Sequence, residues 1–296
     1  MLRISEDRVA AAGRGVPSVT IKAIDPWVNV SMGSMANTPF MKKVKEEYFK
    51  AGEDFFRDIE ADELIERMDA IGIEKSFLTI DPGCPEQRVL DFTTMYAGRF
   101  YLAAAPRLKE GMNALWAMED LARDYPVIMA RVMPFELDLP PSDPIYYPLY
   151  SKCLEMDIPV GINTGLPGPP VPGECQHPMA LDRICLHFPQ LKIIMQHGAD
   201  PWWDIAIRLM IKYRNLYLMT SAYSPKYLPQ SLLHYMNTRG KQKIMFASDH
   251  PVLSMDRCLQ EAQALDLRPE VLENYLYNNA EAVLFEDRNP RYGEFK

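Results

Sequence analysis

The chain has 296 residues, of which 48% are hydrophobic and 24% charged, and its formal net charge is −8. This composition is typical of a globular protein, and no uninterrupted apolar run is long enough to cross a bilayer. Basic residues occur singly or in short mixed runs such as KKVKEE, so the sequence has no concentration of positive charge that would bind nucleic acid. A small-molecule ligand is therefore expected.

Short apolar runs alternate with segments of helical periodicity along the chain, which predicts parallel strands joined by helices. An open doubly wound sheet would more often carry a glycine-rich turn after its first strand, and DPWVNVSMG is not such a turn. The expected α/β fold is therefore a (β/α)8 TIM barrel, formed by a single domain over residues 19–285. Its expected strands are 19–25, 75–81, 100–106, 127–134, 158–165, 192–198, 216–222 and 243–251.

The loop after the first expected strand is long and forms an insertion over residues 31–60. Within it, residues 40–57 have a helical pattern, with Val44, Tyr48 and Phe55 among the apolar positions. Since the loops that follow barrel strands emerge at the catalytic end, we expect this segment to be a helical lid over the cavity that holds Asp249. The alternative is that its aromatic residues only pack the lid onto the barrel or onto a second subunit.

The two ends of the chain are expected to lie outside the barrel, residues 1–18 as an N-terminal extension and residues 286–296 as a tail. The opening MLRISEDRVAAAGRG mixes both charge signs and lacks the apolar segment of a secretory signal. The five cysteines are odd in number and form no C-x-x-C pair, so reduced structural thiols are expected. We therefore expect a cytoplasmic homodimer with no nucleic-acid or membrane partner.

Polar residues gather at the ends of the expected strands, where barrel enzymes carry their chemistry. One of them, Arg131, interrupts the apolar strand VIMARVMP, so its guanidinium either pairs with a substrate carboxylate or forms an internal salt bridge with a barrel acid. His250 follows Asp249 and, by strand alternation, is expected to point away from it. The full set of polar strand-end residues is Asp25, Trp27, Asn29, Asp81, Arg131, Asn163, His197, Ser221 and Asp249.

Six motifs occur in a characteristic order and spacing: DPWVN, GINTG, QHGADPWWD, TSAYSPKYLP, ASDHP and NNAEAVL. With them the chain resembles the amidohydrolase-related proteins, in particular the branch of the aminocarboxymuconate-semialdehyde decarboxylases and related hydrolases. The resemblance spans roughly residues 19–285 and is strong from Asp157 onward. It implies a TIM-barrel enzyme with its active site at the strand ends.

In that family the first strand usually ends in Asp-x-His-x-His, the fifth in His-Thr-Gly, the sixth in His-Gly and the eighth in Ser-Asp, and these residues hold a divalent metal. Here Trp27 and Asn29 replace the first pair of histidines and Asn163 the third, while His197 and Asp249 agree with the family. A catalytic zinc site needs about three nitrogen, sulfur or carboxylate ligands, so no metal cofactor is expected. Should a divalent metal such as zinc bind, the fallback ligands are His197, Asp249, His250 and His177.

The resemblance and the strand-end positions assign two catalytic residues. Asp249 acts as a general base on water or on a substrate proton, or it is only a hydrogen-bond acceptor of the barrel rim. His197 orients a substrate carbonyl or carboxylate, or shuttles a proton, or is a satisfied core histidine. Substrate binding is expected from Arg131, Asn163, Trp27 and Asn29.

The sequence thus predicts an amidohydrolase-like hydrolase for a small cyclic or aromatic carboxylate or ester-like substrate. In the leading mechanism, Asp249 takes a proton from water without a metal, and His197 and Arg131 stabilise the charge that develops on the attacked carbonyl. Two alternatives stay open. One is decarboxylation or another C–C cleavage, in which Asp249 or His197 delivers a proton to carbon, and the other is a non-catalytic barrel that binds a ligand.

Overall fold

The structure, a computed structural model, describes residues 22–33, 38–49 and 56–286. The expected extension 1–18 and nearly all of the tail 286–296 lie outside these ranges, as does Phe55 of the expected lid. Within the ranges, no helix combines the length and the apolar character needed to cross a membrane.

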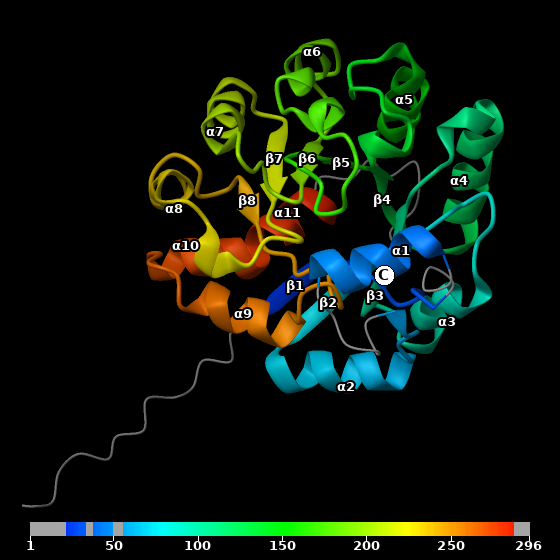
Figure 1. Ribbon diagram of the computed structural model, residues 1–296, viewed down its shortest axis with the longest axis horizontal. Helices are drawn as coiled ribbons and strands as arrows, with labels where there is room; N and C mark the ends of the chain where they lie inside the picture. The colour runs from blue at the N-terminus through cyan, green and yellow to red at the C-terminus, as the bar shows by residue number, and fades with distance from the viewer. Residues whose placement is uncertain (1–21, 34–37, 50–55, 287–296) are drawn as a thin grey trace, which may run out of the picture.

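Eight parallel strands form one curled sheet in chain order, as the TIM-barrel prediction requires (Figure 1). The sheet closes beyond the regular ladder, where Val28 and His250 form an isolated parallel bridge. On either side of this bridge, the Asn29 N–H donates to the His250 carbonyl at 2.7 Å and the Asp249 N–H donates to the Trp27 carbonyl at 3.0 Å. The strands are β1 (Ala23–Val28), β2 (Ile73–Ile80), β3 (Phe100–Ala104), β4 (Val127–Val132), β5 (Val160–Asn163), β6 (Ile193–Gln196), β7 (Leu216–Met219) and β8 (Ile244–Met245).

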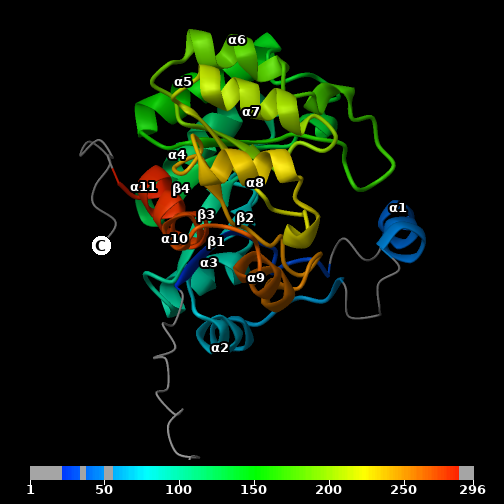
Figure 2. The same cartoon turned by 90° about the vertical axis from the view of Figure 1, so that its left-hand side faces the viewer.

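Helices surround the curled sheet, which both views show (Figures 1 and 2). The α-helices are α1 (Pro39–Lys43), α2 (Ala61–Ile71), α3 (Gln87–Met95), α4 (Met112–Asp124), α5 (Tyr147–Met156), α6 (Ala180–His187), α7 (Trp203–Lys212), α8 (Gln230–Asn237), α9 (Met255–Gln263), α10 (Pro269–Glu273) and α11 (Asn279–Leu284). Short 3-10 turns are η4 (Leu108–Glu110), η5 (Pro134–Glu136), η6 (Pro144–Tyr146), η7 (Glu174–Gln176) and η8 (Pro225–Tyr227), and π-helical turns are η2 (Val44–Phe49) and η9 (Asn274–Asn278).

Strand alternation divides the apolar residues into an inner and an outer core. On β4, Ala130 and Val132 belong to the large cluster between strands and helices, whereas Met129 belongs to the smaller cluster inside the barrel. Arg131 follows Met129 by two positions and therefore points inward. The same spacing on β2 places Thr79 above the interior residue Phe77.

The first and last strands differ from their predicted bounds. Of the first expected strand, residues 19–25, the part 19–21 lies outside the described ranges. The observed β1 covers Ala23–Val28 and so continues past Asp25 through Pro26, with a register irregularity between Asp25 and Val28. Proline cannot donate a ladder hydrogen bond, so a strand tolerates it at such an irregularity. The eighth strand was expected over residues 243–251 but its ladder covers only Ile244 and Met245.

The inserted segment after β1 is helical where it is described, as α1 followed by η2. Figure 1 shows α1 crossing in front of the barrel, and Figure 2 shows it set outward from the remaining helices and strands. Val44 is buried, whereas Tyr48 is 47% exposed. The helical part of the lid prediction is thus confirmed for residues 39–49, and the contact with the cavity of Asp249 stays a prediction.

Candidate active site

The two residues expected to be catalytic share an uncommon backbone conformation. His197 directly follows β6 and has a φ of 64°, and Asp249 follows β8 and has a φ of 67°. Only a few per cent of non-glycine residues adopt positive φ, and such a residue costs on the order of 1–3 kcal/mol. Strained positions of this kind cluster at active sites, where the surrounding structure holds them in place.

Asp249 is buried and bound to the end of the first strand. The Asn29 Nδ2 donates to Asp249 Oδ1 at 2.8 Å, and the Trp27 Nε1 donates to Asn29 Oδ1 at 3.2 Å. Burial raises the pKa of Asp249 to about 7, while the amide of Asn29 and the charge of Arg131 act in the opposite direction. Asn29 thus connects the carboxyl group to the indole by a continuous chain of hydrogen bonds.

Arg131 is the largest fully buried side chain of the described residues and is 1% exposed. It donates through Nη1 to the Thr79 hydroxyl and through Nη2 to the Pro26 carbonyl at 3.0 Å, while its Nε has no hydrogen-bond partner in the part of the chain that the structure describes. Burial lowers its pKa to about 9, and the nearby acids Asp249 and Asp25 oppose this shift. At neutral pH the site therefore holds a fixed positive charge.

Trp27 lies between Arg131 and His197. The guanidinium carbon of Arg131 is 3.4 Å from the centre of the Trp27 ring system, which is a cation–π contact. The centres of the Trp27 and His197 rings are 4.2 Å apart, with their planes tilted by 44°. Trp27 is only 4% exposed, so it joins the two polar residues as a buried spacer rather than forming an open pocket wall.

His197 is held by the neighbouring strand through Ser221. The Ser221 hydroxyl accepts the backbone N–H of His197 at 3.1 Å and lies 2.9 Å from its Nδ1. Burial, together with the positive charge of Arg131, lowers the pKa of His197 to about 3. The imidazole is therefore neutral at physiological pH and interacts with a ligand by hydrogen bonding rather than as a cation.

Asn163 ends β5 and is paired in register with Gln196 at the end of β6. Both side chains are buried, and Asn163 Oδ1 and both terminal atoms of Gln196 have no hydrogen-bond partner among the described residues. Gln196 occupies the space left by Gly161, where an added Cβ would lie 2.0 Å from Gln196 Nε2. Sequence reasoning did not single out Gln196 or Thr79, although their place two residues after Ile194 and Phe77 marks both as inward-facing.

Asp25 has a structural position at the seam of the barrel. Its carboxylate accepts the N–H and the hydroxyl of Ser248 and the N–H of Trp27, and so joins β1 to the segment after β8. Burial raises the pKa of Asp25 to about 6.

Two of the four fallback metal ligands, His250 and His177, lie away from Asp249 and His197. His250 Nε2 is 3.3 Å from Arg67 Nη1 on α2, so its side chain points away from Asp249 as expected. His177 packs on Trp202, with ring centres 4.6 Å apart. Across the described ranges, no three His, Cys, Asp or Glu side chains are grouped so that they could hold a metal ion.

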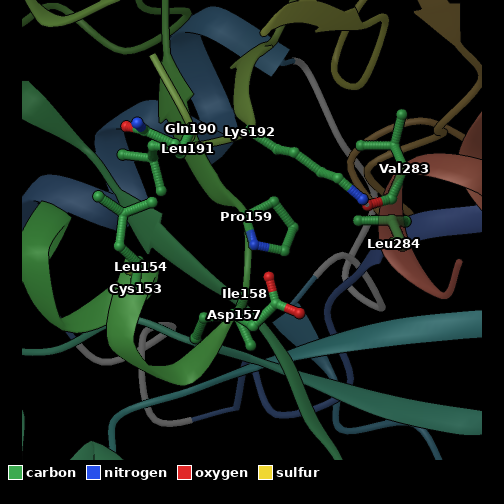
Figure 3. A pocket seen from close by; sticks show the side chains of 10 residues that line it. All are labelled: Cys153, Leu154, Asp157, Ile158, Pro159, Gln190, Leu191, Lys192, Val283 and Leu284. Atoms are coloured by element: carbon green, nitrogen blue, oxygen red, sulfur yellow. Dashed lines mark hydrogen bonds between the residues drawn. The ribbon is translucent and has the colours of Figure 1, made fainter. Parts of the chain in front are cut away.

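Two cavities lie at opposite ends of the barrel. One of about 300 Å³ is formed by the loops after β3 and β4, at the catalytic end, and Arg131 lines it. The other, of about 30 Å³, is lined by the segments before β5 and β6 and by α11 (Figure 3). There Lys192 Nζ donates to the Val283 carbonyl at 3.2 Å. The smaller volume suits about one water molecule, so a substrate is expected only at the catalytic end.

Solved structures with the same fold cover nearly the whole chain. An uncharacterized TIM-barrel protein from Bordetella bronchiseptica is 22% identical, with a TM-score of 0.72 over 89% of this chain and 98% of the other. The 2,6-dihydroxybenzoate decarboxylase from Rhizobium is 17% identical, with a TM-score of 0.67 over 89% and 98%. A dihydroxybenzoic acid decarboxylase from a Polaromonas species is 18% identical, with a TM-score of 0.65 over 90% and 98%. None of the curated proteins matches the chain.

The expectation that no metal is involved is wrong in the light of these structures. The Polaromonas enzyme was crystallised with bound manganese, and so was a 5-carboxyvanillate decarboxylase from Novosphingobium aromaticivorans. The expectation applied the ligand requirements of zinc, whereas manganese also accepts carboxylate and amide oxygens. In this chain the atoms of suitable chemistry are the Asp249 carboxylate, the His197 imidazole and Asn163 Oδ1, a buried oxygen without a hydrogen-bond partner among the residues described.

A sequence comparison identifies the family. The family model described as Amidohydrolase matches residues 25–285, which include every strand from β2 to β8 and both His197 and Asp249. The chain belongs to the amidohydrolase family.

Proposed function

We propose that this protein is a lyase that removes carbon dioxide from a small aromatic or cyclic carboxylate. The observation that carries the proposal is the grouping of a buried acid, a buried cation and a neutral imidazole at the catalytic end of one barrel. Asp249, Arg131 and His197 are joined there through Asn29 and Trp27. The structural relatives that act on dihydroxybenzoate and carboxyvanillate support decarboxylation over hydrolysis.

Substrate binding rests on the positive charge of Arg131 and on the amide side chains. Both terminal nitrogens of Arg131 are already bonded, to Thr79 and to the Pro26 carbonyl, so the guanidinium attracts an anionic ring without clamping it in bidentate fashion. Where no metal ion is bound, His197, held by Ser221, offers Nε2 to an oxygen of the substrate. Asn29 keeps Asp249 in place beside them.

Asp249 performs the proton transfer. In its acid form it donates a proton to the ring carbon that carries the carboxylate. The bond between that carbon and the carboxylate then breaks, its electron pair returns to the ring, and carbon dioxide leaves. Asp249 regains a proton from water, which completes the cycle. The fixed charge of Arg131 lowers the energy of the anionic substrate throughout.

Manganese, where bound, would be held by Asp249, His197 and Asn163, and would supply a positive charge for the oxygen atoms of the substrate. The chain's own contacts orient these three side chains. Asn29 holds Asp249, Ser221 holds His197, and the pairing of β5 with β6 positions Asn163.

The test is a measurement of carbon dioxide release from a panel of hydroxybenzoates that includes 2,6-dihydroxybenzoate and 5-carboxyvanillate, with manganese in the buffer. A parallel panel of aryl esters, lactones and amides is followed for hydrolysis. Carbon dioxide release from at least one acid, with no hydrolysis, is the expected result. Hydrolysis without carbon dioxide release would replace the proposal by the hydrolase alternative, and saturable binding of an acid without turnover would replace it by the binding barrel.

A further inference from the structure

Three adjacent strands carry buried polar atoms that lack a hydrogen-bond partner in the described part of the chain. They are Arg131 Nε on β4, Asn163 Oδ1 at the end of β5, and both Oε1 and Nε2 of Gln196 at the end of β6. None of the three residues is more than 2% exposed, so surface water does not replace the missing partners. Burying polar groups without partners costs stability, so four such atoms at one end of the barrel indicate a role in the site.

Gln196 extends across β5 toward the strand of Arg131. A Cβ atom added to Gly161 would collide with Gln196 Nε2 and Cδ, so the carboxamide fills the place in front of this glycine. Gly161 is in register with Arg131 on β4, and Asn163 lies two residues further along the same face of β5. The carboxamide of Gln196 therefore lies in the row of Arg131 and directly next to the row of Asn163.

The four atoms can satisfy one another in a single way. Arg131 Nε and Gln196 Nε2 are donors, whereas Gln196 Oε1 and Asn163 Oδ1 are acceptors. Because the oxygen and nitrogen of one side-chain amide cannot bond to each other, Gln196 has to accept from Arg131 Nε and donate to Asn163 Oδ1. A methionine of similar length would fill the same space without offering either bond.

We propose that Gln196 is a positioning residue that connects Arg131 to Asn163 by these two hydrogen bonds and holds the Asn163 oxygen toward a manganese ion. The inference rests on the proposed function, because it takes Asn163 to be a ligand of that ion. Hydrogen bonds in a site often tighten only when the site is occupied. Gln196 acts on the ion through Asn163, and the loss of a residue that orients a metal ligand typically lowers metal affinity by about 10- to 100-fold.

Two variants break this connection in different ways. Gln196→Met keeps the length of the side chain and removes its donor and its acceptor. Gly161→Ala leaves Gln196 intact but places a methyl group where the carboxamide lies, and Gly161 is not among the glycines with positive φ, so the backbone tolerates alanine. Isothermal titration of the metal-free, full-length protein with Mn²⁺ is expected to give a dissociation constant at least tenfold higher for each variant than for wild type.

Thermal unfolding of the metal-free protein separates positioning from packing. Gln196→Met should keep or raise the thermal midpoint, because an apolar group replaces a buried amide that has no partner among the described residues. The matched control is Gln176→Met, which changes a buried glutamine whose Nε2 donates to the Gly165 carbonyl at 2.8 Å. This control should lower the midpoint and keep the Mn²⁺ affinity within twofold of wild type.

A double variant tests whether Gly161 acts through Gln196. In the background of Gln196→Ala, the further change Gly161→Ala should leave the Mn²⁺ affinity within twofold, because the carboxamide that it would displace is absent. An additional tenfold loss in this background would show that Gly161→Ala disturbs the site by another route, and would overturn the inference.

Three further results would overturn it: no saturable Mn²⁺ binding by wild type, an affinity of Gln196→Met within twofold of wild type, or an equal loss in Gln176→Met. Gly161→Ala decides the question if Gln196→Met does not fold. Carbon dioxide release by wild type is measured separately. Release with unchanged Mn²⁺ affinity in Gln196→Met would keep the proposed function and remove this inference, and the expected affinities without any release would do the reverse.

Discussion

Asn29 donates its side-chain amide to Asp249 at 2.8 Å and so joins the ends of the first and last strands at the centre of the site. A donor to a carboxylate favours its ionised form and lowers its pKa. Asn29→Ala should therefore raise the pKa of Asp249 above about 7, and the alkaline limb of the pH–rate profile should move upward by about one unit. Asn113→Ala, at an exposed position on α4, is the control. If the alkaline limb does not move in the Asn29 variant, the ionisation that controls the rate is not that of Asp249.

Asp249→Asn tests the proton donor directly. The substitution is nearly isosteric and keeps an oxygen for the Asn29 amide, so the fold should survive. Loss of a general acid lowers the rate by a factor of about 10² to 10⁴, and this is the expected fall in carbon dioxide release. Asp204→Asn, at an exposed position in the first turn of α7, serves as the control. Full activity in a folded Asp249 variant would refute the mechanism.

The fold could be predicted from the sequence because the strands and helices of a barrel each produce a periodic pattern of apolar residues, which is visible in a single sequence. The chain positions of all eight strands were predicted, and the strand-end rule brought Trp27, Asn29, Arg131, His197 and Asp249 into one group. The stacking of Arg131 on Trp27 was not predicted, because it depends on a register irregularity in β1 that no local pattern encodes. Gln196 was missed because its significance comes from Gly161 on the neighbouring strand.

The metal expectation failed for a chemical reason. The number of histidines indicates how well a site suits zinc, and the amide oxygen of Asn163 is not a usual zinc ligand. Oxygen-preferring ions follow different rules, so the loss of histidines does not exclude them. The ligand set that a sequence displays therefore has to be judged against each metal separately.

Arg131 should contribute strongly to stability, because its buried charge has two hydrogen bonds and a ring contact. Arg131→Lys cannot reach Thr79, the Pro26 carbonyl and the Trp27 face together. The free energy of unfolding in urea should fall by about 2–4 kcal/mol, the range for disrupting a buried charged group. Arg123→Lys, on the surface of α4, should change it by less than about 0.5 kcal/mol. Equal small effects in both variants would show that the Arg131 contacts are not stabilising.

Manganese binding can be followed without any substrate. Mn²⁺ should raise the thermal midpoint of wild type, and this increase should disappear in His197→Gln and persist in His234→Gln, whose histidine is exposed on α8. Asn29→His should increase manganese affinity, since it adds an imidazole next to Asp249. Metal content per chain, measured by mass spectrometry after dialysis, gives an independent readout. Stabilisation that is equal in wild type and His197→Gln would place the ion outside this site.

The raised pKa of Asp249 also predicts how stability depends on pH. The ordinary pKa of an aspartate side chain is 3.8, whereas that of Asp249 in the folded protein is about 7, so the folded state binds the proton more tightly. Between about pH 4 and pH 7 the folded state holds a proton that the unfolded state has released, and stability falls as the pH rises through this window. Asp249→Asn removes this dependence, whereas the contributions of His197 and His250 are common to both proteins and cancel in the comparison.

The unfolding free energy of Asp249→Asn minus that of wild type should therefore increase by a few kcal/mol from pH 4 to pH 8, because each unit of pKa shift corresponds to about 1.4 kcal/mol. Urea denaturation at pH 4, 6 and 8, with a chelator present so that no metal occupies the carboxylate, gives the difference at each point. Asp204→Asn supplies the baseline of an exposed carboxyl group. A difference that stays constant across this pH range would mean that Asp249 ionises in the folded protein as it does in the unfolded chain, and that burial does not hold it in its acid form.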